Sequence, residues 1–276
     1  MTPVDLGTFG VWMSRSVLTN EAAVAAEGLG YRTLWIGGSP GADLADVDAM
    51  LDATESLIVA TGIVNIWRAD AAETARSYRR IEERHPGRFV LGIGTGHPEA
   101  DAARRSPLRA LAAYLDVLDA EGVPRDRRVV AALGPRTIAL AAERSLGIHP
   151  YLTTPEHTRW AREALGGRPL IAPEQMVLAP RPEAEARAAG REILRRYLGM
   201  SNYTSTLRRF GFADADLDGD GSDALVDRIT PWGSDEHIAD AVRAHLDAGA
   251  DHVCVQVIPQ RDDPRPTLER LAAALG

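Results

Sequence analysis

The sequence contains no lysine, since all 31 of its basic residues are arginine. Enzymes that form a Schiff base with a substrate or with pyridoxal phosphate need a lysine amine, so this chemistry is excluded. The phosphate-binding P-loop is excluded for the same reason, because its lysine contacts the nucleotide.

Cysteine is nearly absent, and acidic residues outnumber basic ones. The single cysteine, Cys254, cannot form a disulfide within the chain, and a cytoplasmic setting fits this count. The net charge of −8 argues against non-specific binding to nucleic acid, which needs a basic surface. A local arginine or a helix N-terminus can still hold an anionic ligand.

Long apolar runs are also missing. The first residues, MTPVDLGTFGVWMSRS, lack a basic segment followed by an apolar stretch, so we expect no signal peptide. No apolar run approaches the length of about 18 residues that a membrane span needs. We therefore expect a cytoplasmic protein that binds a small-molecule substrate and neither membrane nor nucleic acid.

Short β-rich runs alternate with amphipathic helical patterns along almost the whole chain. The expected strands lie at 7–13, 32–37, 58–64, 89–94, 128–133, 148–152, 171–178 and 252–258. Helical patterns include 19–29, 70–84, 153–165 and 234–248. Such alternation predicts an α/β fold with a parallel sheet, and eight units favour a TIM (β/α)8 barrel over an open, doubly wound sheet.

The unit between the seventh and eighth strands is longer than the others. We interpret about 180–232 as a helical and loop insertion on a single barrel domain that spans residues 1–276. Within it, 216–227 (DLDGDGSDALVD) matches the first six positions of a calcium-binding loop. Asp223 and Asp227 stand where that loop needs an apolar residue and a glutamate, so we expect a solvated loop and no metal site.

Active sites of (β/α)8 barrels lie at the C-terminal ends of the strands. The residues that follow the expected strands are mostly glycine, tryptophan and small polar residues, with few carboxylates. Paired acids, a Ser-His-Asp set and metal-ligand clusters are not visible there. Such an opening suits a flat aromatic ligand, and a cofactor carries the chemistry where acid and base groups are few.

Five segments, taken in order, resemble the luciferase-like oxidoreductases. They are EGLGYRTLWIG at 27–37, IVATGIVNIW at 58–67, GRFVLGIGTGHPE at 87–99, ALGPRTIALAAE at 132–143 and GSDEHIADAVRAHLDAGADHVCVQV at 233–257. The chain is most similar to the branch that uses the deazaflavin coenzyme F420. The resemblance implies an F420-dependent oxidoreductase that transfers hydride between the deazaflavin and an unidentified small organic substrate.

Two alternatives stay open beside that expectation. One is an FMN-dependent monooxygenase of the same family, supplied by a separate cofactor reductase. The other is a barrel that binds a cofactor without turnover. Relatives are often dimers, so a homodimer is expected as well.

The resemblance also implies a cofactor site. In the deazaflavin branch the third strand ends with a non-proline cis peptide whose bulge backs the ring, and the matching residues are Gly62 and Ile63. The other implied cofactor-binding residues are Asn65, Gly94, Thr95, Gly96, Leu133, Gly134, Pro135 and Arg136. A helix expected to begin near Thr137 would bind the phosphate-bearing tail through its free N–H groups. Arg136 either adds a charge-assisted contact or lies on a solvated face.

Three further residues are candidates for the chemistry or the substrate pocket. His97 is the candidate for proton transfer, with a structural role as the alternative. Trp12 and Trp67 shape the substrate pocket or pack the mouth of the barrel. Gly37 and Gly38 stand where deazaflavin relatives often have Asp-His, which puts that acid/base pair in question here.

The remaining histidines and Cys254 carry no catalytic expectation. His237 and His245 are expected on the solvated side of a helix. His149 and His252 flank expected strand starts, the end of a barrel that concerns stability. Cys254 is expected to be a small buried hydrophobe.

Overall fold

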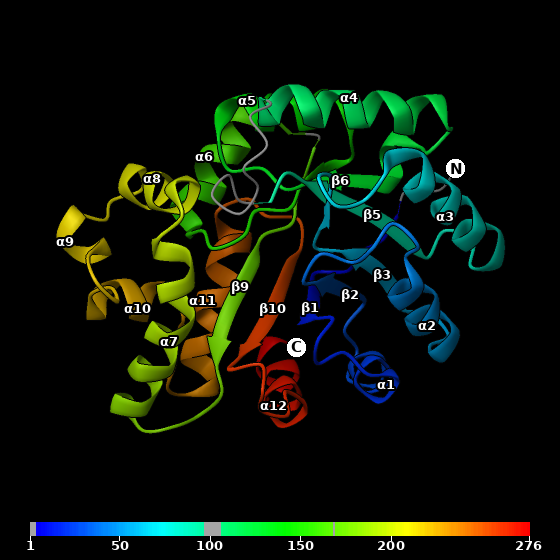
Figure 1. Ribbon diagram of the computed structural model, residues 1–276. Helices are drawn as coiled ribbons and strands as arrows, with labels where there is room; N and C mark the ends of the chain where they lie inside the picture. Colours follow the sequence, from blue (N-terminus) through cyan, green and yellow to red (C-terminus); the bar gives the residue numbers. More distant parts are fainter. Residues whose placement is uncertain (1–3, 97–105, 168) are drawn as a thin grey trace.

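The computed structural model describes residues 4–96, 106–167 and 169–276, and it has an α/β fold with parallel strands at the centre and helices outside (Figure 1). The strands are β1 Phe9–Ser14, β2 Thr33–Gly37, β3 Ile58–Thr61, β4 Val64–Asn65, β5 Phe89–Gly94, β6 Arg128–Val130, β7 Gly147–Ile148, β8 Leu170–Ile171, β9 Glu174–Leu178 and β10 Val253–Ile258. The first six α-helices are α1 Asn20–Gly28, α2 Ala45–Ala53, α3 Ala71–Arg84, α4 Pro107–Ala120, α5 Pro135–Arg144 and α6 Pro155–Leu165, with a short 3-10 helix at Arg125–Arg127. The last six are α7 Glu183–Leu198, α8 Ser201–Arg209, α9 Asp214–Leu217, α10 Asp223–Ile229, α11 Asp235–Asp247 and α12 Arg265–Leu275.

All paired strands run parallel. Their order is β8-β7-β6-β5-β3-β2-β1-β10-β9, with β4 beside β5. The strands at the two ends of this order, β8 and β9, are separated in the chain only by Ala172 and Pro173. One short segment thus joins both ends of the order, which is possible only if the sheet curls.

The strands follow the sequence pattern closely, because their buried residues are apolar on both faces. Each of the eight expected strand regions overlaps a strand, and four of them differ clearly in extent. The fifth ends at Val130, three residues before the expected end. The third is divided into β3 and β4 at Gly62 and Ile63, and the seventh into β8 and β9. The sixth ends at Ile148, two residues before Pro150, which has no N–H to donate to a neighbouring strand.

Two helices are capped by the first residue of an expected helical range, 19–29 and 70–84. Thr19 accepts a hydrogen bond from the N–H of Ala22 (3.2 Å), and Asp70 accepts one from Glu73 (2.9 Å). Helix α5 begins at Pro135, two residues before the expected start, because a proline at the first helical position loses no hydrogen bond.

Buried residues form three apolar clusters. The largest lies between the sheet and the outer helices, and a second joins β9 to α7, α8 and α10. The third fills the interior of the curled sheet and contains Trp12, Trp35 and Cys254. Cys254 is fully buried, as predicted. Throughout the described ranges, none of the helices is long and apolar enough to cross a membrane.

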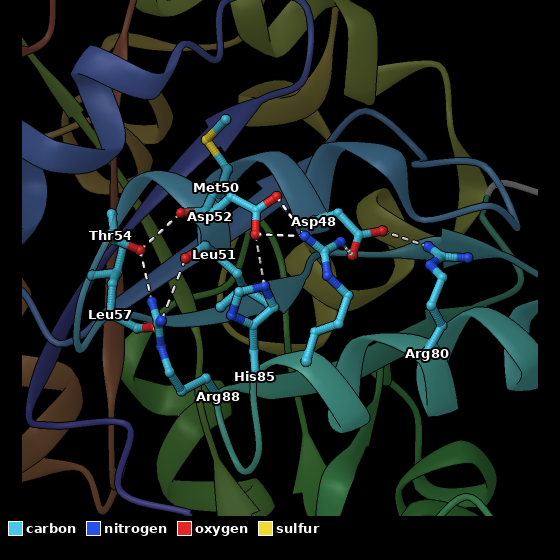
Figure 2. Close-up of polar contacts among 10 residues, drawn as sticks. Asp48, Met50, Leu51, Asp52, Thr54, Leu57, Arg80, His85 and Arg88 are labelled. Atoms are coloured by element: carbon cyan, nitrogen blue, oxygen red, sulfur yellow. Dashed lines mark hydrogen bonds and ion pairs between the residues drawn. The ribbon is translucent and has the colours of Figure 1, made fainter.

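A polar network fastens α2 to α3 and to the start of β5 (Figure 2). His85 and the Asp52 carboxylate lie 2.9 Å apart. Arg88 donates to the hydroxyl of Thr54 (2.8 Å) and to the carbonyl of Leu57 (3.1 Å). Since Leu57 directly precedes β3, this network holds β3 in place beside β5.

The segment between β9 and α11 is helical, and several of its residues contact the rest of the fold. Phe210 packs on His157 and Trp160 of α6, and Arg228 of α10 pairs with Glu156. Within 216–227, which the sequence suggested to be a solvated loop, Asp220 pairs with Arg195 (2.6 Å) and Asp227 with Arg187 (2.7 Å). The expectation of a solvated loop is wrong in part, because residues 223–227 lie in α10 and Leu225 and Val226 are buried. No group of three or more potential metal ligands occurs in the part of the chain that the structure describes.

Candidate functional site

A cavity of about 670 Å³ opens at the C-terminal ends of the strands. Its size lies within the range of ligand pockets, about 300–1,000 Å³. Residues that follow β1, β3, β5, β6 and β7 form its base, and α7 and α8 cover one side. The cavity therefore occupies the end of the sheet where the sequence analysis places the chemistry.

The main chain between β3 and β4 forms part of the cavity wall. The peptide bond between Gly62 and Ile63 is cis, which confirms the geometry that the family resemblance predicts. A Cβ atom on Gly62 would lie 2.7 Å from Nε1 of Trp12 and 3.0 Å from Nε2 of His149. Both distances are too short for normal contacts, so a glycine is required for these two rings to approach the main chain.

The ring of Trp12 fills the space beside Gly37, which together with Gly38 stands where deazaflavin relatives often have Asp-His. A Cβ atom on Gly37 would lie only 1.8 Å from the indole ring of Trp12. Gly37 is thus the space in which Trp12 packs, and a larger residue at 37 would displace the ring. This packing is a physical reason for the missing Asp-His pair.

His149 faces the cavity from the end of β7. Its Nδ1 lies 2.7 Å from the carbonyl oxygen of Ala172, and its ring stacks on Trp35 with centroids 4.2 Å apart. Burial lowers the pKa of His149 to about 4, so the ring is neutral near pH 7. His149 was expected at a strand start, which is wrong, because β7 ends at Ile148 and His149 lines the cavity.

Tyrosine hydroxyls line the side of the cavity that α7 and α8 cover. Tyr151 donates a hydrogen bond to Oε1 of Gln256 (3.0 Å), and its hydroxyl lies 2.9 Å from that of Tyr197. The ring of Tyr151 also packs against Trp12, with centroids 5.6 Å apart. Burial raises the pKa of Tyr151 well above its ordinary value, so this hydroxyl keeps its proton.

The rim of the cavity is positively charged although the whole chain is acidic. Arg15, Arg68 and Arg196 are among the lining residues, whereas none of the described lining residues is an aspartate or a glutamate. Arg15 pairs with Asp46 at 2.9 Å. Arg68 and Arg196 are exposed and have no ion pair within the described ranges. The rim can therefore attract an anionic group.

The structure brings eight of the predicted site residues to the cavity. They are Trp12, Gly62, Ile63, Asn65, Thr95, Gly96, Leu133 and Gly134. Gly94 lies just behind it, where a Cβ atom would touch Ala131 and Ile63. Pro135 and Arg136 are exposed at the start of α5, and Trp67 is not among the lining residues. His97 lies outside the described residues.

Other lining residues were missed by sequence reasoning. His149, Tyr151 and Gln256 come from strand ends, and Arg196, Tyr197 and Tyr203 come from α7 and α8. Correct placement of the end of β7 would have found His149. The residues from α7 and α8 carry no comparable signal, because their position depends on how these helices fold back over the sheet.

One further histidine differs from its expected environment. His245 was expected on the solvated side of α11, but it is fully buried and lies 3.0 Å from Oε1 of Gln175 and 2.8 Å from the hydroxyl of Thr158. Burial lowers its pKa to about 3. It joins α11 to β9 and α6 and is not among the residues that line the cavity.

Comparisons with known proteins agree with this architecture. The model of the family described as luciferase-like monooxygenase matches residues 18–252. No curated protein matches the sequence.

Several solved structures resemble the chain over almost its full length. An F420-dependent secondary alcohol dehydrogenase in complex with an F420-acetone adduct has a TM-score of 0.73 and 15% identity, with coverage of 98% of this chain and 99% of the other. A coenzyme F420-dependent tetrahydromethanopterin reductase from Methanopyrus kandleri has a TM-score of 0.69 and 14% identity, with coverage of 97% and 98%. The oxygenating constituent of 3,6-diketocamphane monooxygenase from Pseudomonas putida, in complex with FMN, has a TM-score of 0.69 and 15% identity, again with coverage of 97% and 98%. At these identities the likeness shows the fold alone.

Proposed function

Because the chain belongs to the luciferase-like monooxygenase family, we propose that it is an F420-dependent oxidoreductase whose cavity holds the deazaflavin ring against Gly62 and Ile63. The substrate is a small organic molecule that binds in the same cavity. The observation that carries the proposal is a cavity with a glycine in its wall, an arginine rim and no carboxylate among its described lining residues.

The wall of the cavity fits a flat ring. Gly62 has no side chain, and Gly96 and Gly134 are also lining residues, so a planar ligand can approach the main chain closely. Asn65 and Thr95 supply polar groups beside them. A ligand with an apolar ring and polar edges suits this mixture.

The rim fits an anionic tail. Arg68 and Arg196 are exposed cations without ion pairs among the described residues, and arginine binds phosphate through paired N–H groups. Gly134 and Thr137, at the start of α5, also line the cavity. The N–H groups at the start of a helix favour a bound phosphate, so Arg196 and the start of α5 would both bind the tail.

A bound deazaflavin supplies hydride-transfer chemistry, and the protein residues bind and orient the reactants. The glycine-lined wall fixes one face of the ring, and the arginine rim holds the tail. Ile193 of α7 and Met200, which directly precedes α8, would exclude water from the other side of the ring.

We also propose that the curled sheet closes as a TIM (β/α)8 barrel and forms one domain with the helical segment at about 180–232 as an insertion. The support is the segment 170–178, in which β8 pairs with β7 and β9 pairs with β10. Helices α7 to α10 lie between β9 and α11, so they are additional to the usual single helix of such a unit.

An FMN-dependent monooxygenase is the second candidate. The fold is shared by F420-dependent enzymes and by the FMN-bound monooxygenase constituent, and both cofactors carry a flat ring and a phosphate. Such an enzyme would need a separate reductase to supply reduced FMN. Reduced flavin reacts readily with oxygen whereas reduced deazaflavin does not, so oxygen uptake separates the two.

Titration of the purified protein with coenzyme F420 and with FMN tests the proposal. We expect saturable binding, tighter for F420, which weakens as salt is added because arginines contribute to it. Arg196→Gln should weaken binding by about fivefold, since it removes one charge-assisted contact. Saturable binding of neither cofactor would refute the oxidoreductase function.

Arg195→Gln provides the matched control for that titration. Arg195 lies on the same helix but pairs with Asp220 and is not among the lining residues. Its loss removes the same charge without removing a cavity contact. If both variants weaken binding equally, the effect is one of overall charge and Arg196 is not a binding residue.

A further inference from the structure

Glu174, at the start of β9, is a buried carboxyl group that the proposed function does not use. Its side chain is 1% exposed, and its Oε1 has no hydrogen-bond partner among the described residues. Burial raises the pKa of Glu174 to about 8, so the group is a neutral acid at pH 7. Glu174 is not among the residues that line the cavity, so it can act on a ligand only through other residues.

Two hydrogen bonds of Glu174 lie on either side of Tyr151. The N–H of Glu174 donates to the carbonyl oxygen of Pro150 (2.9 Å), and Oε2 of Glu174 accepts from the N–H of Leu152 (3.4 Å). Tyr151 stands between these two residues and lines the cavity. One residue of β9 therefore holds the turn that follows β7 on both sides of a cavity residue.

The main chain of this turn depends on that support. Leu152 has a φ of +55°, a left-handed conformation that a bulky residue rarely adopts. Leu152 is also buried, so bulk water cannot replace Oε2 of Glu174 as the acceptor for its N–H. Loss of that acceptor would leave a buried donor without a partner in a strained turn.

Tyr151 passes the position of the turn on to the wall of the cavity. Its hydroxyl donates to Oε1 of Gln256 (3.0 Å), and its ring packs against Trp12 with centroids 5.6 Å apart. The indole ring of Trp12 lies beside Gly62. A shift of Tyr151 would therefore move the ring that borders the main chain of the proposed cofactor site.

We propose that Glu174 is a positioning residue of the cavity, and that its protonated form holds Tyr151 and, through it, Trp12 where the cofactor ring binds. An ionised Glu174 would be a buried charge with one weak hydrogen bond, which is costly unless water reaches it. The turn would have to open to admit that water. This inference rests on the proposed function in that Tyr151 and Trp12 face the bound cofactor.

The other titratable groups around Glu174 do not change charge in the same pH range. They are Tyr151, Tyr197 of α7, Tyr203 of α8 and Cys254 of β10, and burial raises the pKa of each, so all four keep their protons at pH 9. Arg196 acts on the tyrosines of α7 and α8, and an arginine is charged at both pH 7 and pH 9.

Fluorescence titration with F420 at pH 7 and pH 9 tests the inference, with Glu174→Gln beside the unsubstituted protein. Glutamine keeps an acceptor for the N–H of Leu152 and has no proton to lose. About one-tenth of Glu174 is protonated at pH 9, so the dissociation constant should rise about tenfold more in the unsubstituted protein than in the variant. This comparison cancels any titration of the cofactor itself, and an equal rise in the two proteins overturns the proposal.

Hydrogen exchange at the amide of Leu152, followed by NMR at pH 7, reads the turn without any cofactor. Glu174→Leu removes the acceptor and should speed exchange there about tenfold relative to Glu174→Gln, which keeps it. Equal protection in the two variants would contradict the positioning role. The pH comparison above decides the proposal even where Glu174→Leu does not fold. If the protein binds neither F420 nor FMN, the proposed function fails, whereas exchange at Leu152 still shows whether Glu174 holds the turn.

Cys254→Ala is the control for a change beside Glu174. Cys254 lies directly opposite Glu174 in the pairing of β10 with β9 and is not a cavity residue. This variant should keep both the pH dependence of F420 binding and the protection of Leu152. A pH dependence that disappears in Cys254→Ala would assign it to the thiol and overturn the proposal.

Discussion

Two tryptophan–histidine pairs occupy the interior of the sheet, one at each end. In the lower pair, the indole N–H of Trp35 donates to Nε2 of His252 (3.0 Å), and Nδ1 of His252 lies 2.8 Å from the carbonyl of Gly7. In the upper pair, Nδ1 of His149 is bonded to a carbonyl in the same way, but Nε2 of His149 and the indole N–H of Trp12 have no partner among the described residues. We call Trp35 and His252 the closed pair, and Trp12 and His149 the open pair.

Both pairs have the same residue types and all four side chains are buried, and burial lowers the pKa of each histidine to about 4. Composition therefore does not distinguish them. The pairs differ in whether Nε2 of the histidine has a hydrogen-bond partner, and in the end of the sheet at which each pair lies. The closed pair lies at the start of β10, where barrels are built for stability, and the open pair lies at the end of β7, where they bind ligands.

Breaking the closed pair should have the largest effect on stability. His252→Phe leaves the buried N–H of Trp35 and the carbonyl of Gly7 without a partner, so the free energy of unfolding should fall by about 3 kcal/mol. Urea denaturation at pH 7 measures this change. An unfolding free energy that stays within about 0.5 kcal/mol of the unsubstituted protein would show that the closed pair is not structural.

A side chain at Gly62, between the rings of the open pair, should have the largest effect on cofactor binding. Gly62→Val places atoms less than about 3 Å from Trp12 and His149, so cofactor affinity should fall by about a hundredfold. Fluorescence titration with F420 checks this. Gly28→Ala is the control, because a Cβ at Gly28 touches nothing within 4 Å. Equal affinity of Gly62→Val and Gly28→Ala would place the ring elsewhere.

Lowering the pH should destabilise the folded protein through both histidines to the same extent. A histidine with a pKa of about 6.5 when unfolded and about 4 when folded binds fewer protons in the folded state. Stability is therefore lost as pH falls from about 6.5 towards 4, by about 2 kcal/mol per histidine at pH 5.

The difference between the unsubstituted protein and each histidine variant measures this effect. The comparison is needed because Glu174 changes the stability in the opposite direction. Burial raises the pKa of Glu174 to about 8. Its contribution to the free energy of unfolding is therefore fully present below about pH 4.5 and is lost as pH rises through 8. Denaturation curves at pH 5 and pH 7.5 suffice. A His149→Phe variant with unchanged acid sensitivity would mean that His149 is already solvated.

Breaking the open pair should have the smallest effect on stability. His149→Phe removes one hydrogen bond, to the carbonyl of Ala172, and no bond at Nε2, so the free energy of unfolding should fall by about 1 kcal/mol. Denaturation under the conditions used for His252→Phe provides the comparison. A loss as large as that of His252→Phe would show that the two pairs are equivalent.

Much of the fold and part of the site could be predicted from the sequence. Apolar strands covered on both faces give a strong pattern, and it predicted the bounds of β5, which ends at Gly94 as expected. The cis peptide between Gly62 and Ile63 was predicted from the family motif and is confirmed. That prediction came from the resemblance, because the residues alone fit an ordinary glycine in a strand.

The rest of the site depends on tertiary packing. Tyr197 and Arg196 reach the cavity because α7 folds back over the sheet, and no local pattern encodes that path. His149 was misplaced because β7 has only two residues and stops before Pro150. His245 was misplaced because its partners, Gln175 and Thr158, lie far away in sequence.

The central claim is that a redox ring lies against the main chain of Gly62 and Ile63 at the C-terminal end of the third strand. A crystal structure of the protein with bound coenzyme F420 tests it most directly. The account predicts ring density in contact with both residues and the phosphate-bearing tail near Arg196. Density for the ring at another surface, or a cavity filled by protein side chains in the complex, would contradict it.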